Sequence, residues 1–298
     1  MTVDSEQQAL LADLTIRIPN RVRRVLRSCR KLPMSLHIGL FILFVQLTTA
    51  LLANVLYPGD PFEMVGMPFL TPGEDPQFPL GTDILGRDIA AGVIHGSRVS
   101  LLVGLAATLI ATCVGTTIGL VSGYFGGWID HVLMRITELF QIIPHFLFAI
   151  ILVSIMGADL SNIIIAIGLT SWSLVARLAR AETLALRELD FVKISVAMGG
   201  GHLRAVLTHV LPNALPPVIV SASILTALAV LTEAGLAFFG MSDSNHLSWG
   251  SMIGASRDAL LTAPYMTLIP GAAIVLAILG LSLIGDGLGQ MLRRGHRL

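Results

Sequence analysis

The chain has 298 residues, of which 54% are hydrophobic and 13% charged, and its 19 basic and 19 acidic side chains balance. This balance excludes the basic footprint of a nucleic-acid-binding protein and the charge-rich composition of a disordered tail. The mean hydropathy of +0.80 instead indicates a protein that crosses a lipid bilayer.

Six charge-free runs are each close to the roughly 20 residues that a helix needs to cross the hydrocarbon core. They are Met34 to Leu56, Val99 to Gly123, Leu139 to Ala158, Leu160 to Ala176, Val210 to Thr232 and Ala259 to Gly285. The third and fourth are nearly contiguous, so we expect a tight helical hairpin there. No run alternates as a barrel strand does, and lipid tolerates no open sheet edge, so we predict an all-α membrane protein with six transmembrane helices.

The amino-terminal segment 1–33 is basic and precedes the first apolar run. That run has no small-x-small cleavage site and is longer than the core of a signal peptide, so it is predicted to be an uncleaved anchor. The stretch Arg21 to Lys31 is basic enough to lie on anionic lipid headgroups. Cys29 and Cys113 fall in this segment and in the second span, and we expect no disulfide between them.

Lysine and arginine accumulate on the cytoplasmic side of membrane proteins, so their distribution predicts the orientation. Placing both termini in the cytoplasm assigns 16 basic residues to cytoplasmic segments and 3 to external ones. We therefore expect a membrane domain at 34–292 with external loops at 57–98 and 241–258. The loop at 177–212 and the tail at 293–298 are then cytoplasmic.

The loop at 177–212 ends in an unusual stretch, DFVKISVAMGGGHLRAVLTHVLPN at 190–213. Apolar residues recur at helical spacing on both sides of the three glycines at 199–201, which are expected to separate two short helices. Pro212 marks the passage to the fifth span. Such an amphipathic helix–glycine–helix unit can dock in a groove of a soluble partner or lie as an interfacial helix on the lipid.

The stretch resembles the cytoplasmic EAA loop in the permease subunits of bacterial ABC importers. That loop has a glycine seven residues into its motif and a Leu-Pro at its end, which Gly199 and Leu211-Pro212 match. Lys193-Ile194-Ser195 stands where the family has Glu-Ala-Ala. The narrower likeness is to the C-type permease of the dipeptide, oligopeptide and nickel subfamily.

Further matching stretches cover roughly residues 34 to 292. They are LGTDILGRD at 80–88, GSRVSLLVG at 96–104, GYFGGWID at 123–130, EAGLAFFGM at 233–241, SWG at 248–250 and GDGL at 285–288. The segment from Ser242 to Trp249 departs from the prolines usual in relatives, at a place where ligand or receptor could be sensed.

The resemblance implies a translocation subunit in the bacterial inner membrane, embedded in membrane lipids. It would pair with a second permease, two P-loop ATPases and an extracytoplasmic binding protein, and import di- or oligopeptides, with nickel or a metal chelate as the alternative. The chain has no phosphate-binding loop, because neither of its lysines, Lys31 and Lys193, follows a glycine. We therefore expect no cofactor and no enzymatic activity here, with ATP and Mg²⁺ on the partner subunits, and no nucleic-acid partner.

Three groups of site residues follow from the resemblance. Coupling to the ATPase is predicted for Asp190, Lys193, Ser195, Gly199, Gly200, Gly201, His202, Arg204, Leu211 and Pro212. Bracing of the first external loop, or contact with the binding protein, is predicted for Asp83, Arg87, Asp88 and Trp249. A place on the translocation path or at its gate is predicted for Glu233, Phe238 and Met241, although Glu233 could also sit at the lipid–water interface.

Other features have simpler interpretations. Gly115, Gly119 and Gly123 repeat every four residues and are expected to let a neighbouring helix pack closely. Arg135 and Glu138 are spaced to pair on a helix surface. Prolines interrupt the third, fifth and sixth spans at 144, 216, 217 and 270. The histidines at 131, 145, 202, 209 and 246 share no ligand spacing, so no metal site is expected.

Two other function classes are weaker. A stand-alone secondary carrier needs ion-coupling residues within the membrane, whereas Glu138, Glu233 and Asp286 lie near the ends of the spans. An intramembrane enzyme needs a nucleophile with a base, or clustered metal ligands, at depth. The sequence shows neither.

Overall fold

The computed structural model describes residues 33–295, and every regular element within that range is a helix. The prediction of an all-α membrane fold is confirmed. The predicted basic segment, including Cys29 and the stretch Arg21 to Lys31, lies outside the described residues except for Pro33. The last three residues of the predicted tail lie outside them as well.

The helices follow one another with short connections, apart from the loop at 57–88. In chain order they are α3 (Met34–Leu51), α4 (Ala53–Leu56), α5 (Ile89–Phe125), α6 (Gly127–Ile142), α7 (His145–Met156), α8 (Leu160–Arg187), α9 (Asp190–Ala197), α10 (His202–Ala205), the π-helical turn η1 (Val206–Val210), α11 (Leu211–Phe238), α12 (Trp249–Ser256), the 3₁₀ turn η2 (Arg257–Ala259) and α13 (Tyr265–Gly295).

Within residues 33–295, five helical segments are long and apolar enough to cross a membrane, and a bent pair of helices gives a sixth if it is counted as one span. The five are α3, α5, α8, the continuous segment from α10 to α11, and α13. The bent pair is α6 and α7, whose axes meet at 87°. The number of spans therefore agrees with the six apolar runs of the sequence.

The third span, predicted at 139–158, is interrupted at Pro144, as the sequence indicated. Its residues divide between α6 and α7, and the break lies at Ile143 and Pro144. Ile143 is extended, with ψ of 127°, as expected for a residue whose helical conformation clashes with a following proline ring. The expected hairpin with the fourth span is confirmed for α7, which returns into α8 through Gly157 and shares a buried cluster with it.

Helix α5 begins at Ile89 rather than at Val99, because the carboxylate of Asp88 caps it. Asp88 Oδ1 accepts a hydrogen bond of 2.8 Å from the backbone N–H of Ala90. Arg98, taken as a span boundary, lies inside the helix. Its guanidinium donates to the carbonyl of Ala50 in α3 and, at 2.8 Å, to the side chain of Asn54 in α4, so its hydrogen-bonding groups find acceptors within the chain.

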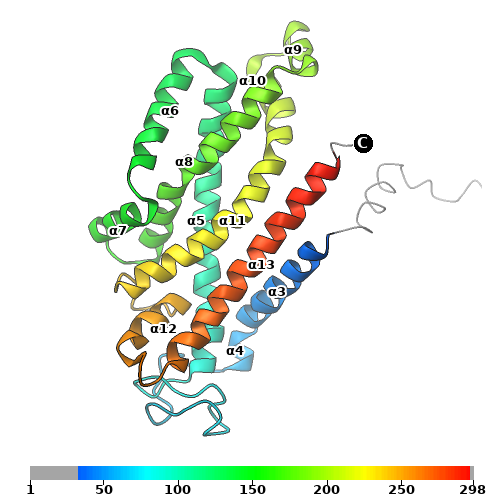
Figure 1. Ribbon diagram of the computed structural model, residues 1–298. Helices are drawn as coiled ribbons and strands as arrows, with labels where there is room; N and C mark the ends of the chain where they lie inside the picture. Colours follow the sequence, from blue (N-terminus) through cyan, green and yellow to red (C-terminus); the bar gives the residue numbers. More distant parts are fainter. Residues whose placement is uncertain (1–32, 296–298) are drawn as a thin grey trace, which may run out of the picture.

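The closest helix contact joins α5 and α8, and the predicted role of the three glycines is confirmed. A Cβ on Gly115 or Gly119 would lie 2.5 Å from the carbonyl oxygen of Trp172 or Ala176, and one on Gly123 would lie 2.8 Å from Thr183 Cβ. Glycine at these positions lets the two backbones touch. Helix α11 packs against both, and α13 lies between α11 and α3 (Figure 1).

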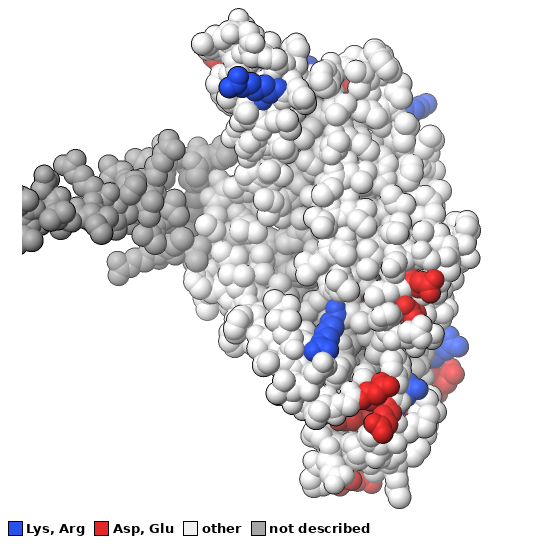
Figure 2. Space-filling model, turned by 180° about the vertical axis from the view of Figure 1, so that it is seen from behind, with Lys and Arg blue, Asp and Glu red and all other residues white. Residues whose placement is uncertain are grey.

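The bundle has two distinct ends (Figure 1). We call them the α9 end, which carries the 190–201 segment, and the α12 end, which carries α12 and the 57–88 loop. The start of α3 and the end of α13 both point toward the α9 half. Seen from behind, most visible acidic side chains lie in the half toward the α12 end, below a broad surface without charge (Figure 2).

Candidate functional site

The glycines at 199–201 end helix α9 as predicted, but they contribute unequally. Gly199 has a φ of +86°, which favours glycine, and the N–H of Gly200 donates to the carbonyl of Ser195 at 3.0 Å. A Cβ on Gly200 would collide with that same carbonyl oxygen. Gly201 has an ordinary φ of −58° and open space around it. Two of the three positions therefore require glycine.

The second half of the predicted hairpin is not a separate short helix. Helix α10 continues through the π-helical turn η1 into α11, which makes one segment from His202 to Phe238. Pro212 does not mark a break, because it occupies the first turn of α11 directly after the wider π turn. A residue without an N–H is tolerated in a first helical turn. Residues 190–212, which we call the α9 unit, are thus continuous with a membrane-spanning helix.

The outer face of this unit is apolar and uncovered. The most exposed apolar side chains are Phe191 (45% exposed), Ile194 (55%), Met198 (83%), Leu203 (69%) and Leu207 (52%). The single buried residue of α9 is Val192. It packs with Leu120 of α5, with Val210 at the end of η1 and with Ala214 in the first turn of α11. One apolar contact therefore ties α9 to two long helices while its other apolar side chains face outward.

Polar contacts connect the unit to the ends of α5 and α8. Lys193 Nζ lies 2.9 Å from Glu188 Oε2, and this hydrogen bond lowers the pKa of the Glu188 carboxyl. Arg187 donates to Glu188 and, at 2.9 Å, to the carbonyl of Gly123 near the end of α5. His202 Nδ1 lies 3.1 Å from the hydroxyl of Tyr124. The position that departs from the Glu-Ala-Ala pattern is thus used in an ion pair within this chain.

The other predicted coupling residues lie on the same unit. Asp190 is in the first turn of α9, where a carboxylate complements the helix dipole, and Arg204 is exposed in α10. The backbone carbonyl of Ser195 accepts the hydrogen bond from the N–H of Gly200 that closes the glycine turn. Leu211 packs against the cluster around Val192. The structure therefore brings all ten predicted positions to one end of the bundle.

At the α12 end a carboxylate is buried in a polar network. Glu233 of α11 is 4% exposed, and its Oε1 accepts a 2.6 Å hydrogen bond from Ser248 Oγ. Its Oε2 lies 3.5 Å from Ser100 Oγ of α5. Ser248 also caps α12 through reciprocal hydrogen bonds with Ser251. The carboxylate thus joins α5, α11 and α12 in the interior of the bundle.

Trp249 belongs to this same network and not to an outer surface. Its backbone N–H donates to Ser100 Oγ at 3.1 Å, and its indole Nε1 donates to the carbonyl of Val93 at 2.8 Å. The residue is 1% exposed, so its side chain is enclosed by the bundle, and its contact with a binding protein stays a prediction. The Ser-Trp-Gly match was specific, but the sequence did not indicate that a serine from α5 would enclose it.

The two other predicted gate residues lie where α11 ends. Phe238 is 43% exposed and its ring meets that of Phe239 edge-on, at 5.8 Å between centroids. Met241 packs against the core cluster of α5, α7, α8 and α11. Their place on a path or gate stays a prediction.

The connection from α11 to α12 is held by Asp243, a residue that sequence reasoning did not single out. Its carboxylate accepts hydrogen bonds from the N–H of Leu160 (3.1 Å), the N–H of Asn245 (2.8 Å) and His246 Nδ1 (2.8 Å). Burial opposes ionisation, but these donors outweigh it and hold the pKa of Asp243 below its ordinary value. The sequence flagged this segment only as a departure from relatives, whereas the structure shows that it is tied to α8.

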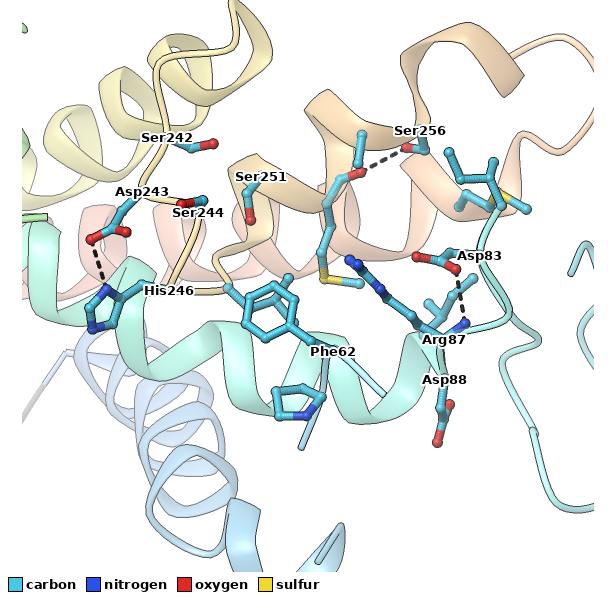
Figure 3. A pocket seen from close by; sticks show the side chains of 18 residues that line it. Phe62, Asp83, Arg87, Asp88, Ser242, Asp243, Ser244, His246, Ser251 and Ser256 are labelled. Carbon is cyan, nitrogen blue, oxygen red and sulfur yellow. Dashed lines mark hydrogen bonds and ion pairs between the residues drawn. The ribbon is translucent and has the colours of Figure 1, made fainter. Parts of the chain in front are cut away.

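The predicted external-loop residues divide into two kinds. Asp83 Oδ1 accepts hydrogen bonds from the N–H groups of Leu85 (2.8 Å) and Arg87 (2.9 Å), and Asp88 caps α5. Burial raises the pKa of the Asp88 carboxyl. Both acids brace the loop, as one of the two interpretations expected. Arg87 differs, because its guanidinium projects into a pocket beside the ring of Phe62 (Figure 3).

Within residues 33–295 no group of three or more His, Cys, Asp and Glu side chains is arranged to hold a metal ion. Two of these histidines make other contacts. His145 Nε2 lies 2.8 Å from Ser171 Oγ, and His209 meets the ring of Phe191 edge-on. Arg135 and Glu138 form the expected surface pair at 3.2 Å.

Comparison with known proteins gives one family and several relatives. Residues 115–297 match the family described as binding-protein-dependent transport system inner membrane component. The chain is 36% identical to the dipeptide transport system permease protein DppC of Alkalihalophilus pseudofirmus, over 71% of this chain and 70% of the relative. It is 32% identical to the glutathione transport system permease protein GsiD of Pectobacterium atrosepticum, over 95% and 93% of the two chains. A putative peptide permease protein of Brucella suis is 36% identical, over 82% and 83%.

Proposed function

Because this chain belongs to the family of binding-protein-dependent transport system inner membrane components, we propose that it forms half of the translocation path of an ATP-driven peptide importer. Membership makes it a multi-pass inner-membrane permease subunit whose partners include an ATPase and a binding protein. The finer composition, with a second permease and two ATPase subunits, is part of the proposal. Relatives named for dipeptide, glutathione and peptide transport support di- or oligopeptides over nickel as cargo.

We place the α9 end in the cytoplasm and the α12 end outside. The excess of lysine and arginine in the predicted cytoplasmic segments supports this orientation. The α9 end carries Arg187, Lys193 and Arg204, while the α12 end carries the acidic 57–88 loop. The α9 end then meets the ATPase, and the α12 end meets the binding protein.

The observation that carries the coupling role is the uncovered apolar face of the α9 unit. Burying one Phe, Ile or Met side chain stabilises a complex by about 1.5–3 kcal/mol. Five such side chains facing outward on a short, glycine-bounded unit fit a helix that inserts into a groove of the ATPase. An interfacial helix on the lipid is the alternative that the experiment below separates.

The contacts of α9 suggest how ATPase closure would reach the membrane helices. Val192 ties α9 to α5 and α11, and Arg187 ties the end of α8 to the end of α5. From Gly123, α5 continues for roughly 35 Å, at ~1.5 Å per residue, to Ser100 in the Glu233 network. Displacement of α9 would thus move α5 and the α12 end as one body, biasing the path between inward-facing and outward-facing states.

This chain would hydrolyse no ATP itself. Its two lysines lie outside any phosphate-loop pattern, so ATP and Mg²⁺ would be bound by the partner ATPases. Transport by the permease would therefore depend on its contact with the ATPase subunits, which would pass their conformational change to the membrane helices.

The test is to tag this chain, extract it gently from its native membrane and identify the proteins that co-purify in stoichiometric amounts. Recovery of P-loop ATPases and a second permease, with ATP hydrolysis stimulated by a binding protein and its peptide, is the expected result. Recovery of this chain alone, transporting in liposomes without ATP, would establish a secondary carrier and an interfacial role for α9.

A further inference from the structure

A pocket of about 170 Å³ lies at the α12 end, between the 57–88 loop, the start of α5 and the connection from α11 to α12 (Figure 3). Its walls are mostly apolar and include Phe62, Leu247, Met252 and Met266. A cavity of ~150 Å³ is enough for one benzene molecule. The pocket therefore admits a single side chain and is too small for a peptide cargo.

Arg87 has unused hydrogen-bonding capacity in this pocket. Its guanidinium carbon lies 5.3 Å from the centroid of the Phe62 ring, and its Nε is buried without a hydrogen-bond partner. Across residues 33–295 the ion pairs involve other arginines and not this one. A buried donor left without an acceptor costs free energy, because its hydrogen bond to water has been lost and not replaced. A partner that supplies the acceptor would recover this free energy.

The acids that line the pocket do not supply that acceptor. Asp83, Asp88 and Asp243 each accept N–H donors from their own loops, as described above. Figure 3 shows the Asp243 side chain turned toward His246. It also shows that the side chains of Arg87 and Asp88 extend to opposite sides of the backbone that carries them. These carboxylates stabilise turns and a helix start. Among the charged side chains that line the pocket, Arg87 is thus the one that makes no hydrogen bond or ion pair with the described residues.

We propose that this pocket receives one glutamate or aspartate side chain of the extracytoplasmic binding protein, and that its carboxylate pairs with Arg87. The inference rests on the proposed function, which places the α12 end outside. A glutamate has an apolar stem for the walls and a planar carboxylate that a guanidinium can bind through two parallel hydrogen bonds. The neighbouring Asp83 and Asp243 carboxylates disfavour retention of a free anion, so the contact forms when a whole protein surface docks.

The experiment measures the affinity of the purified binding protein for the complete importer in nanodiscs of neutral lipid. We compare Arg87→Gln with Arg257→Gln, a matched loss of charge at the same end, where the side chain is 54% exposed and faces Asp258. Arg87→Gln is expected to weaken binding about tenfold, which corresponds to about 1.4 kcal/mol, because it removes one charge-assisted hydrogen-bonded pair. Arg257→Gln should stay within about twofold, and added salt should weaken the wild type more than Arg87→Gln.

An Arg87→Lys variant identifies the partner residue directly. The natural lysines are Lys31, in the amino-terminal segment, and Lys193, at the α9 end, so the variant adds the single lysine of the α12 end. A zero-length carbodiimide cross-linker should join its amine to a carboxylate of the binding protein, which mass spectrometry of the linked peptides would locate. This readout does not depend on whether Arg87→Gln assembles.

Several outcomes would overturn the inference. They are wild-type affinity in Arg87→Gln, an equal loss in Arg257→Gln, and cross-links confined to acids of this chain. An affinity difference that appears only when anionic phosphatidylglycerol is added would assign the pocket to a lipid headgroup instead. Failure of the proposed function would look different, because no binding protein would then stimulate ATP hydrolysis by the wild-type complex.

Discussion

At the α9 end, apolar side chains face outward and Val192 is the one buried residue of α9, whereas at the α12 end even the carboxylate of Glu233 is enclosed. The first arrangement leaves a surface whose partner must come from another protein. The second satisfies the buried Glu233 carboxylate within this chain, through Ser100 and Ser248. The α9 end is therefore suited to bind a partner that displaces it, whereas the α12 end is suited to follow that displacement as a rigid unit.

The two ends also differ in how the backbone is held. At the α9 end, a glycine with φ of +86° and a turn closed by the carbonyl of Ser195 join α9 to α10. At the α12 end, a capping box on Ser248 and three donors on Asp243 hold the connection from α11 to α12. Helix α5 contacts both ends. Disruption should therefore act on coupling at the first end and on stability at the second.

The largest expected effect is that of Gly200→Val at the α9 end. The added Cβ would collide with the carbonyl oxygen of Ser195, so the turn that presents α9 would open. We expect transport and nucleotide-coupled ATPase stimulation to be abolished, as also for a bulky residue at Gly199. Gly201→Ala is the matched control, because its position has open space and an ordinary φ. ATPase stimulation in Gly200→Val as strong as in Gly201→Ala would contradict the proposed role of the α9 unit in coupling.

The second effect concerns the α12 end. Glu233→Ala removes the carboxyl group that accepts the hydrogen bond from Ser248 Oγ and that lies beside Ser100 Oγ. Loss of a buried hydrogen bond and the unsatisfied hydroxyls it leaves should cost about 1–3 kcal/mol. Glu233→Gln retains an acceptor and should cost less. Thermal unfolding of the purified complex measures both. Glu138→Ala is the control, since that carboxylate is 61% exposed. Unfolding of Glu233→Ala at the wild-type temperature would contradict a stabilising network.

The sequence predicted the α9 end better than the α12 end, because the former is local in sequence. Consecutive glycines between apolar periodic stretches define a helix break within a few residues, and the spacing of Gly115, Gly119 and Gly123 defines close packing on one helix face. The contact between Ser100 and Glu233 spans 133 positions, and neither serine spacing nor apolar periodicity signals it.

Charge and proline were misleading where tertiary contacts decided the outcome. Arg98 delimited the second span in the sequence, but its reach to the Ala50 carbonyl lets α5 continue past it. Pro144 produces a bend of 87° between α6 and α7, while Pro216, Pro217 and Pro270 remain inside helices. Neighbouring helices can satisfy the carbonyls that an internal proline frees, so the residue alone does not determine a break.

The third prediction compares exposed apolar side chains at the two ends. Met198→Ser removes the most exposed apolar group of the α9 unit, 83% exposed, and should weaken association with the ATPase about tenfold, because burial of a methionine contributes about 1.5–3 kcal/mol. Leu261→Ser is the control, since Leu261 is 97% exposed near the α12 end. Affinity is read from titration of the ATPase onto the permease. An unchanged affinity in Met198→Ser would favour an α9 that rests on lipid.

The smallest effect should come from Glu188→Gln, which removes the ion pair with Lys193 while leaving the apolar face of α9 intact. Both side chains are more than half exposed, so solvent and salt screen the pair. The pKa of Glu188 is lowered in the folded state, so any stability that it contributes is present above its unfolded pKa and is lost as pH falls through the lowered value. At neutral pH we expect wild-type unfolding and coupling in Glu188→Gln. A clear loss of coupling without loss of stability would show that this ion pair, and not the apolar face alone, positions α9 for the ATPase.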